Sequence, residues 1–238
     1  MSTHQSTPGL VNWVGYLAIT LLVTLPLAVL TVRSGAWQQG LLVYAISCLG
    51  AAVLLLLVAL LMALPKFAPW RGALAKRAIF ALPGALLLLS MLGGGNYPAI
   101  HDISTDTEDP PVFVAAPKQR GDGSNSLDIE PATLEAQKAA YTDLDTLVTP
   151  ASIEDAFIRA KETSLALGWD IYHEDLSAGI IEAVDTTRIM GFQDDVVIRL
   201  RTNADGTLID LRSVSRVGVS DLGANAARIR RFVEAFPG

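Results

Sequence analysis

The first 101 residues of this chain contain no aspartate and no glutamate, and only five lysines or arginines. All 24 acidic residues follow, so the net charge of −6 combines an excess of five positive charges up to residue 101 with an excess of eleven negative charges beyond it. Charged residues make up 18% of the chain, against about 25% in an ordinary soluble domain. This composition argues against a cytosolic enzyme and indicates an apolar membrane part followed by an acidic water-soluble part.

Cysteine and histidine are almost absent. Cys48 is the only cysteine, so the acidic part has no internal disulfide bond. The three histidines, at His4, His101 and His173, lack the spacing of metal ligands, and we expect no metal centre and no cofactor. The chain also has no P-loop, no dinucleotide-binding fingerprint and no G-x-S-x-G nucleophile motif. Without a basic stripe, the acidic part is not expected to bind nucleic acid.

Three apolar stretches, over residues 11–32, 41–64 and 78–97, are long enough to cross a lipid bilayer as helices. The third includes three consecutive glycines at 93–95, which weaken a helix. The first exceeds the apolar core of a cleaved signal peptide and has no basic residue before Arg33. None of the stretches contains the charged residues on which proton relays and ion pathways depend. We therefore expect a three-helix membrane anchor over residues 1–97.

The orientation of the anchor follows from the loop between the second and third stretches. It carries Lys66, Arg71, Lys76 and Arg77, and loops rich in lysine and arginine stay on the cytoplasmic side. The N-terminus is then cytoplasmic and residues 98–238 are extracytoplasmic. In a bacterium this describes a multi-pass protein of the inner membrane with a periplasmic domain.

The acidic part begins with a segment, residues 98–150, whose prolines and glycines predict an extended lead-in with one short helix over 133–141. Apolar residues at helical spacing then predict a helix over 153–167, with Ser152 and Asp155 as a capping box. Four strands are expected over residues 169–174, 178–184, 195–202 and 207–215. The last two are joined by a turn at 203–206, and connections this short require antiparallel neighbours.

A final helix is expected to begin near Asp221, capped by Ser220 or Asp221, and to run to Phe236. Its apolar stripe comprises Leu222, Ala226, Ile229, Phe232, Val233 and Phe236. Two helices on one face of the sheet give a small domain over residues 98–238. The predicted fold class is a membrane protein with three N-terminal transmembrane α-helices and a C-terminal α+β domain, an antiparallel sheet covered by helices.

The junction between the last strand and the last helix is rich in arginine and hydroxyl groups. Its polar residues are Arg212, Ser213, Ser215, Arg216, Asp221, Asn225 and Arg228. Guanidinium groups and the free N–H groups of a helix start suit a small anionic ligand such as a phosphate or a carboxylate. Alternatively, Ser220 and Asp221 only cap the helix, while Asn225 and Arg228 pair with Asp221 or Asp194 in an internal network.

Two adjacent carboxylates, Asp194 and Asp195, precede the third strand of the predicted sheet. Paired carboxylates can bind a cation or act in acid–base chemistry. Adjacent strand residues point to opposite faces, however, which favours a polar beginning of the strand that faces Arg199 or Arg216.

Three motifs occur in order along the acidic part: AIHDISTD from Ala99, GFQDDVVIR from Gly191, and RSVSR from Arg212 continued by DLGANAARI from Asp221. They resemble the opening, middle and closing motifs of a bacterial family known as domain of unknown function 1499. The resemblance covers most of residues 98–236 and marks His101, Asp102 and Thr105 as motif residues. It implies a shared fold unit and no established reaction.

The sequence favours a non-catalytic function, in which the anchor displays a module that binds a periplasmic protein, a lipid or a small anionic ligand. One alternative is a membrane-tethered hydrolase that uses Asp194 and Asp195, or a serine beside the arginines. Another is an accessory subunit of a membrane complex, with the three helices as the interface. An open pocket around Arg212, Arg216 and Asn225 would favour a ligand site or an enzyme, and side chains that satisfy one another would favour a structural network.

Overall fold

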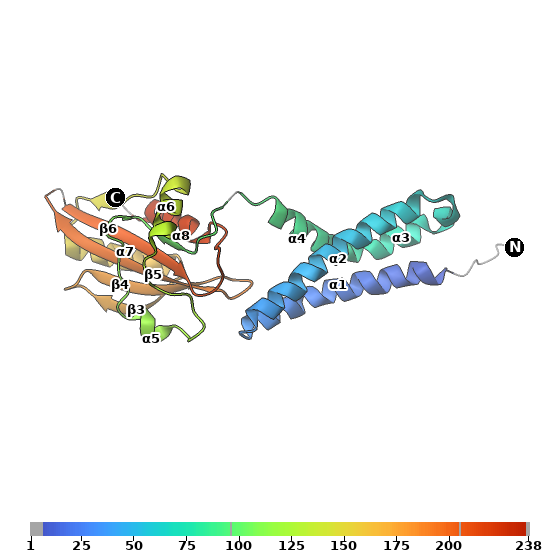
Figure 1. Ribbon diagram of the computed structural model, residues 1–238, viewed down its shortest axis with the longest axis horizontal. Helices are drawn as coiled ribbons and strands as arrows, with labels where there is room; N and C mark the ends of the chain where they lie inside the picture. Colours follow the sequence, from blue (N-terminus) through green and yellow to red (C-terminus); the bar gives the residue numbers. More distant parts are fainter. Residues whose placement is uncertain (1–6, 96, 205, 237–238) are drawn as a thin grey trace. The chain divides into compact units, whose positions relative to one another are not determined.

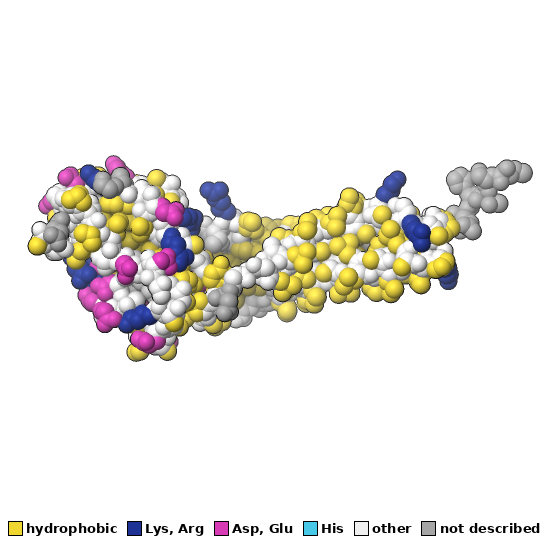
Figure 2. Space-filling view, turned by 90° about the horizontal axis from the view of Figure 1, so that it is seen from above, with side chains coloured by type: hydrophobic (Ala, Val, Ile, Leu, Met, Phe, Trp, Pro, Cys, Tyr) yellow, Lys and Arg dark blue, Asp and Glu magenta, His cyan; other side chains and the backbone are white. Residues whose placement is uncertain are grey.

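A computed structural model describes residues 7–95, 97–204 and 206–236, so His4 and Asp205, which the sequence analysis considered, lie outside the described residues. The chain divides into two compact units, Met1–Gly94 and Gly95–Gly238. Each unit is described by itself (Figure 1). On the visible faces in Figure 2, hydrophobic side chains dominate the helical first unit, and acidic side chains occur only on the second.

The first unit is helical throughout most of its length. Its elements are α1 (Gly9–Arg33), α2 (Trp37–Ala63), a short 3-10 helix (Pro65–Trp70), α3 (Arg71–Ala78), a single 3-10 turn (Ile79–Ala81) and α4 (Leu82–Leu92). Among the described residues, three helical segments are long and apolar enough to cross a membrane: Gly9–Arg33, Trp37–Ala63 and Pro65–Leu92. The fold class predicted for this part is confirmed.

The bounds predicted for the third stretch, 78–97, are wrong at both ends. The helix ends at Leu92, because the three glycines that follow favour the helix poorly. The residues assigned to a loop are helical, since lysine and arginine are good helix formers and do not exclude a helix. A 3-10 turn over Ile79–Ala81 separates α3 from α4 just before Pro83, whose ring would clash with the carbonyl of Ile79 in a regular helix.

Small residues allow the helices of the first unit to approach closely. A Cβ atom on Gly40 would lie 2.5 Å from a methyl group of Val32, and one on Gly84 would lie 2.8 Å from the Cβ of Ala51. The hydroxyls of Thr24 and Ser47 are 2.8 Å apart and join α1 to α2. Small side chains and hydroxyls are what pack helices together where surrounding lipid removes the hydrophobic driving force.

The second unit is built on one antiparallel sheet. Its strands are β1 (Asp102–Ser104), β2 (Leu147–Thr149), β3 (Asp170–Asp175), β4 (Ile180–Thr186), β5 (Gln193–Asn203) and β6 (Gly206–Ser215). The order is β1-β6-β5-β4-β3, and β2 pairs with the beginning of β6 (Figure 1). The four predicted strands are confirmed within two residues at each end. The short β1 and β2 were missed because three residues carry too little periodicity to be recognised.

Helices α7 (Ile153–Ala166) and α8 (Ala224–Ala235) cover one face of this sheet. Val196 and Ile198 of β5 pack there against Phe157 and Phe232, and α6 (Pro131–Ala140) adds the half-buried Ala136 to the same core. The side chain of Ser152 accepts the N–H of Asp155 at 3.1 Å, as the capping box predicts. The antiparallel sheet with its helices agrees with the predicted α+β class.

The start predicted for α8, near Asp221, is three residues too early. Leu222 and Gly223 have φ angles of +52° and +82°, and the left-handed backbone cannot continue into a right-handed helix. Leu222 is 71% exposed, so it does not belong to the apolar stripe that was predicted. Asp221 nevertheless caps the helix, since its carboxylate accepts the N–H groups of Gly223 at 2.8 Å and Asn225 at 2.9 Å.

The second face of the sheet is covered by part of the lead-in, for which the sequence predicted an extended segment with one short helix over 133–141. Alternation along the strands turns Val197 and Val214 to this face. Phe113 and Ala116, at the start of the four-residue helix α5 (Ala116–Gln119), pack against them. The domain is therefore buried on both sides of its sheet.

A substitution at Gly179 tests how tightly the β3–β4 turn packs on β5. Its φ angle is +66°, and an added Cβ would lie 2.3 Å from the carbonyl oxygen of Leu200. We expect Gly179→Ala to lower the free energy of unfolding by about 2–5 kcal/mol, through backbone strain and overlap together. Gly168→Ala is the matched control, because its φ is +83° but its Cβ would meet nothing within 4 Å.

The control should cost about 1–2 kcal/mol from strain alone. Urea denaturation of the full chain in detergent micelles measures both. Equal losses in the two variants would show that the contact with Leu200 is not rigid.

Candidate functional site

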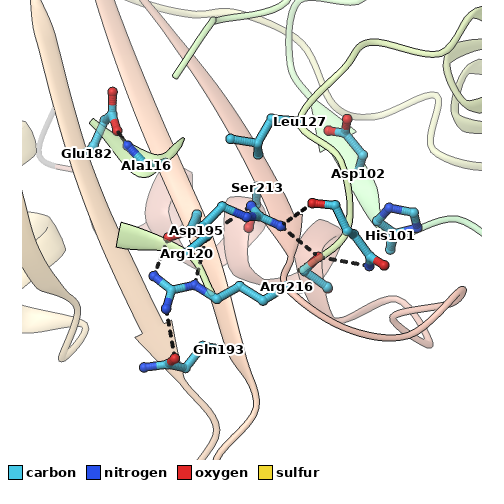
Figure 3. A network of polar contacts seen from close by, with 12 residues as sticks. His101, Asp102, Ala116, Arg120, Leu127, Glu182, Gln193, Asp195, Ser213 and Arg216 are labelled. Carbon is cyan, nitrogen blue, oxygen red and sulfur yellow. Dashed lines mark hydrogen bonds and ion pairs between the residues drawn. The ribbon is translucent and has the colours of Figure 1, made fainter. Parts of the chain in front are cut away.

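The predicted site residues are divided between the two faces of the sheet. Neighbouring residues of β5 and β6 alternate in direction, so Asp194, Ser213 and Ser215 face the helices. Asp195 and Arg216 face the lead-in (Figure 3), and Arg212 does so as well through its bond to Asp102. The residues therefore form two clusters and do not converge on one anion pocket.

The first of these, the helix-side cluster, comprises Asp185, Asp194, Ser213, Ser215, Asn225 and Arg228. Arg228 is its centre and its side chain is only 2% exposed. The guanidinium donates to Asp185 at 2.7 Å, and to Asp194 through a second nitrogen. Its third nitrogen donates to Ser213 at 3.1 Å and to Asn225. Every nitrogen of the side chain is thus occupied.

Asn225 joins the two serines of the helix-side cluster. Its amide nitrogen donates to the Ser215 hydroxyl at 3.0 Å and to the backbone carbonyl of His101 at 2.9 Å. The Ser213 hydroxyl donates to the Asn225 amide oxygen at 2.7 Å. The side-chain partners of both serines are Asn225 and Arg228, so within the described part of the chain no imidazole is placed to activate either as a nucleophile.

The second group, the lead-in cluster, is centred on Asp195, whose side chain is completely buried. Arg216 binds it through two hydrogen bonds of 2.9 and 2.8 Å, and Arg120 of the lead-in donates a third at 3.0 Å. Tyr172 donates a fourth at 3.3 Å. Burial, together with the charge of Asp195, raises the pKa of Tyr172, so the phenol stays protonated and remains a donor.

Arg212 ties the same face to the beginning of the domain. It is 1% exposed and binds the Asp102 carboxylate through two hydrogen bonds of 2.9 and 2.6 Å. It also donates to the backbone carbonyls of Pro111 at 3.2 Å and Leu127 at 2.8 Å, and lies 5.5 Å from the ring centre of Phe113. Four of the five N–H donors of this buried arginine are thus engaged within the domain.

Sequence reasoning missed Glu182, the buried carboxylate in the middle of β4. Its side chain accepts the consecutive backbone N–H groups of Val114, Ala115 and Ala116, the last at 2.7 Å. These amides lead into α5, and the residue is 0% exposed. The available signal was an acid flanked by apolar residues on both sides in a predicted strand, which requires a specific partner. The identity of that partner, 66 residues away, is not visible in the sequence.

A third set of charges lies toward the other end of β5 and β6. Asp210 accepts from Arg199 at 3.1 Å and Arg201 at 2.7 Å, and both arginines also bind Asp106 of the lead-in. Arg199 therefore faces Asp106 and Asp210. Of the two partners that the sequence suggested for the carboxylates at the beginning of the strand, Arg199 and Arg216, Asp195 binds Arg216. The lead-in is joined to the sheet by ion pairs along much of its length.

The motif residues of the opening segment hold β1 and its continuation to β6. The backbone carbonyl of His101 accepts the N–H of Ser215 at 2.9 Å, and Asp102 binds Arg212. The Thr105 hydroxyl accepts the N–H of Leu211 at 2.9 Å. Within the described ranges no group of three histidine, cysteine, aspartate or glutamate side chains is placed to hold a metal ion.

Two open recesses lie near these clusters. One, of about 470 Å³, has a polar lining of Asp185, Thr186, Thr187, Arg188, Arg228 and Arg231, and we call it the arginine recess. The other, of about 380 Å³, lies between α8 and the chain around Leu144 and has an apolar floor that includes Ile229 and Val233. An ion pair between Arg230 and Asp143, with bonds of 2.6 and 2.8 Å, lies at the latter.

The motif residues meet along β6, which contributes residues to both clusters. The family model DUF1499, described as a protein of unknown function, matches residues 102–236. The chain belongs to this family. The resemblance noted in the sequence is thereby confirmed, and the matched residues include all six strands of the sheet. A search of curated proteins gives no match.

We expect Asp195→Asn to destabilise the protein strongly, because it leaves Arg120 and Arg216 without the carboxylate that both bind. Breaking a buried ion pair from one side costs about 3–5 kcal/mol. Lys161→Gln is the control, since it breaks an ion pair with Glu174 whose side chains are about 40% exposed. That change should cost less than about 1 kcal/mol. Thermal melts of the full chain in micelles would contradict a structural role for Asp195 if the two variants melted together.

Asp106 makes the stability of the domain depend on pH. Burial raises the pKa of this carboxyl, but the N–H groups of Asp109 and Glu108 and the guanidiniums of Arg201 and Arg199 outweigh it and hold the pKa below its ordinary value. A depressed folded-state pKa contributes stability that is complete above the unfolded value, about 3.9, and is lost as the pH falls through the folded value.

The variant Asp106→Asn should therefore be less stable than the wild type at neutral pH, with the difference shrinking below about pH 4. Unfolding free energies from urea titrations between pH 7 and pH 2.5 measure this. A difference that stayed constant over the whole range would show that the carboxylate charge contributes nothing.

Proposed function

We propose that the protein is a membrane-anchored binding module without catalytic activity, whose second unit lies on the extracytoplasmic side of the membrane. In a bacterium this is a multi-pass protein of the inner membrane with a periplasmic domain. Its partners are the lipid bilayer and either a periplasmic protein or a small anionic ligand. An acidic domain without a basic stripe is a poor partner for nucleic acid.

The observation that carries a binding role over a catalytic one is how the charged groups of the second unit are used. The side chains that could act as acid, base or nucleophile, including Asp194, Asp195 and Ser213, are buried and bound to neighbours in the same domain. General acid–base or nucleophilic catalysis needs such a group to reach a substrate. The arginine recess borders the helix-side cluster, with Asp185 and Arg228 in its lining, and the recess at Arg230 and Asp143 lies apart from it; both are open and offer surfaces for a ligand.

The orientation is supported by the distribution of charge in the first unit. Arg77 of α3 donates to Asn12 near the start of α1 at 2.9 Å, so the basic segment and the beginning of α1 lie at the same end of this unit. Lysine and arginine concentrate on the cytoplasmic side of a membrane protein. The N-terminus and the basic residues of the third segment then lie toward the cytoplasmic side, and an odd number of spans carries the chain to the opposite side.

Reporter fusions in a bacterial host test the orientation. Alkaline phosphatase fused after Gly238 should be active, because it folds only outside the cytoplasm, and green fluorescent protein at the same point should stay dark. The matched control is a fusion after Trp70, at the end of the segment that precedes α3, where the two reporters should give the reverse pattern. Fluorescence after Gly238 would refute the orientation.

The binding role is tested by purification of the full chain in a mild detergent, followed by native mass spectrometry for bound lipids, small molecules and co-purifying proteins. A reproducible partner that is lost when the recess residues are changed supports the proposal. A chain that carries no partner, and that turns over a model ester or phosphoester in proportion to its concentration, would replace the proposal with the hydrolase alternative.

A further inference from the structure

We propose that the arginine recess binds the phosphate group of a small molecule or of a lipid headgroup. The inference rests on the binding role proposed above and names the chemistry of the ligand. It concerns residues that the sequence analysis did not bring together: the β4–β5 turn, the end of α7 and the outer side of α8.

Arg231 supplies the donors for this site. Its side chain is 57% exposed, and among the described residues its Nε donates to the Ala227 carbonyl at 3.4 Å. The nearest carboxylate oxygen, on Asp185, is 3.9 Å away and beyond hydrogen-bond distance. A guanidinium carries five N–H donors in a planar fork that matches phosphate oxygens, so most of its donors remain available.

Asp185 is shared between two arginines of the recess, Arg228 and, at 3.9 Å, Arg231. The Nε of Arg228 donates to it at 2.7 Å from inside the helix-side cluster. The lining holds three arginines and one aspartate, and Asp194, outside the lining, also binds Arg228, so these three arginines outnumber the two carboxylates by one. A cavity with an excess of positive charge raises the local concentration of anions.

The β4–β5 turn presents the other side of the recess on a defined backbone. The N–H of Thr187 donates to the Phe192 carbonyl at 2.8 Å, and the N–H of Phe192 returns a bond of 2.8 Å to the Thr187 hydroxyl. This closed turn positions Arg188, which lines the recess with Thr186 and Thr187. A second guanidinium and hydroxyl groups are the other donors that phosphate sites commonly use.

The start of α8 contributes little to the anion site, since its N–H groups are in use. Asp221 accepts those of Gly223 and Asn225, so the arginines and not the helix terminus carry the recognition. The volume of about 470 Å³ exceeds what one phosphate needs, and Leu167, Ala224 and Ala227 provide an apolar portion. Pockets of this size hold small organic ligands. A phosphate ester with an organic part therefore fits better than a free ion.

The test uses the full chain in uncharged detergent micelles, titrated with glycerol 3-phosphate at constant ionic strength and followed by calorimetry. The wild type should bind saturably, and Arg231→Gln should weaken binding by about tenfold, the loss expected for one charge-assisted contact. Arg230→Gln is the matched control, because it removes the same charge from the neighbouring residue, whose partner is Asp143. It should bind like the wild type.

A second variant guards against a fold defect in the first. Ala227 lines the recess on an exposed position of α8, and Ala227→Glu should abolish binding by placing a carboxylate among the arginines while leaving the melting temperature nearly unchanged. Equal weakening by Arg230→Gln and Arg231→Gln would mean nonspecific attraction and would overturn the site. A wild type that shows no saturable binding up to about 10 mM, far weaker than a specific site provides, would do the same.

The source of the phosphate is decided by native mass spectrometry of the same preparations. Retained phospholipid that is lost in Arg231→Gln and kept in Arg230→Gln supports the site with a lipid headgroup as its ligand. Binding of glycerol 3-phosphate with no retained lipid supports the site with a soluble phosphate ester. If the phosphate site fails while other partners co-purify with the wild type, the binding role survives and only the ligand class is wrong.

Discussion

Ion pairs removed from water hold the lead-in segment on the sheet, and most of the second unit depends on their completeness. Arg212 is bound by Asp102, and Asp195 is bound by Arg120 and Arg216. These side chains are buried or nearly buried. Each isolated charge would cost several kcal/mol to bury, so a pair is tolerable only when both members and their hydrogen bonds are in place. If the lead-in left the sheet, Arg212 would lose its carboxylate partner and Asp195 would lose Arg120. This is how a segment with few apolar residues becomes a covering layer.

Much of the fold could be predicted because its longer elements have clear periodicity. The strands around Val196 and Leu211 and the helix around Phe157 alternate or repeat at regular spacing, and their bounds agree with the structure within a few residues. The third apolar segment was misplaced because its charges were taken to exclude a helix, whereas Arg71 and Arg77 lie in one. The cover provided by the lead-in could not be predicted, since it depends on partners such as Glu182 and Ala116, 66 residues apart.

The candidate site shows the same limit. Sequence proximity grouped Arg212 with Ser213, but neighbours on a strand point apart, and the two residues belong to different clusters. The pairing of Arg228 with Asp194 had been raised as an alternative from the sequence, and it is present. The donors available to a ligand are instead on Arg231, an exposed helix residue that is inconspicuous in the sequence. The arginines that stood out in the sequence, such as Arg212 and Arg228, are buried and bind groups of their own domain.

The position of β1 opposite β6 constrains the order in which the domain can form. These are its first and last strands, with Asp102 facing Val214, so the sheet cannot close until nearly the whole domain has been synthesised. Local hairpins such as β4–β5 can form early, whereas closure by β1 must meet the entropy of a loop of more than a hundred residues. In that interval β6 presents an unpaired edge, where a strand from another chain can add. The three membrane-capable segments precede the domain in the chain, so they are synthesised before β1 can pair with β6.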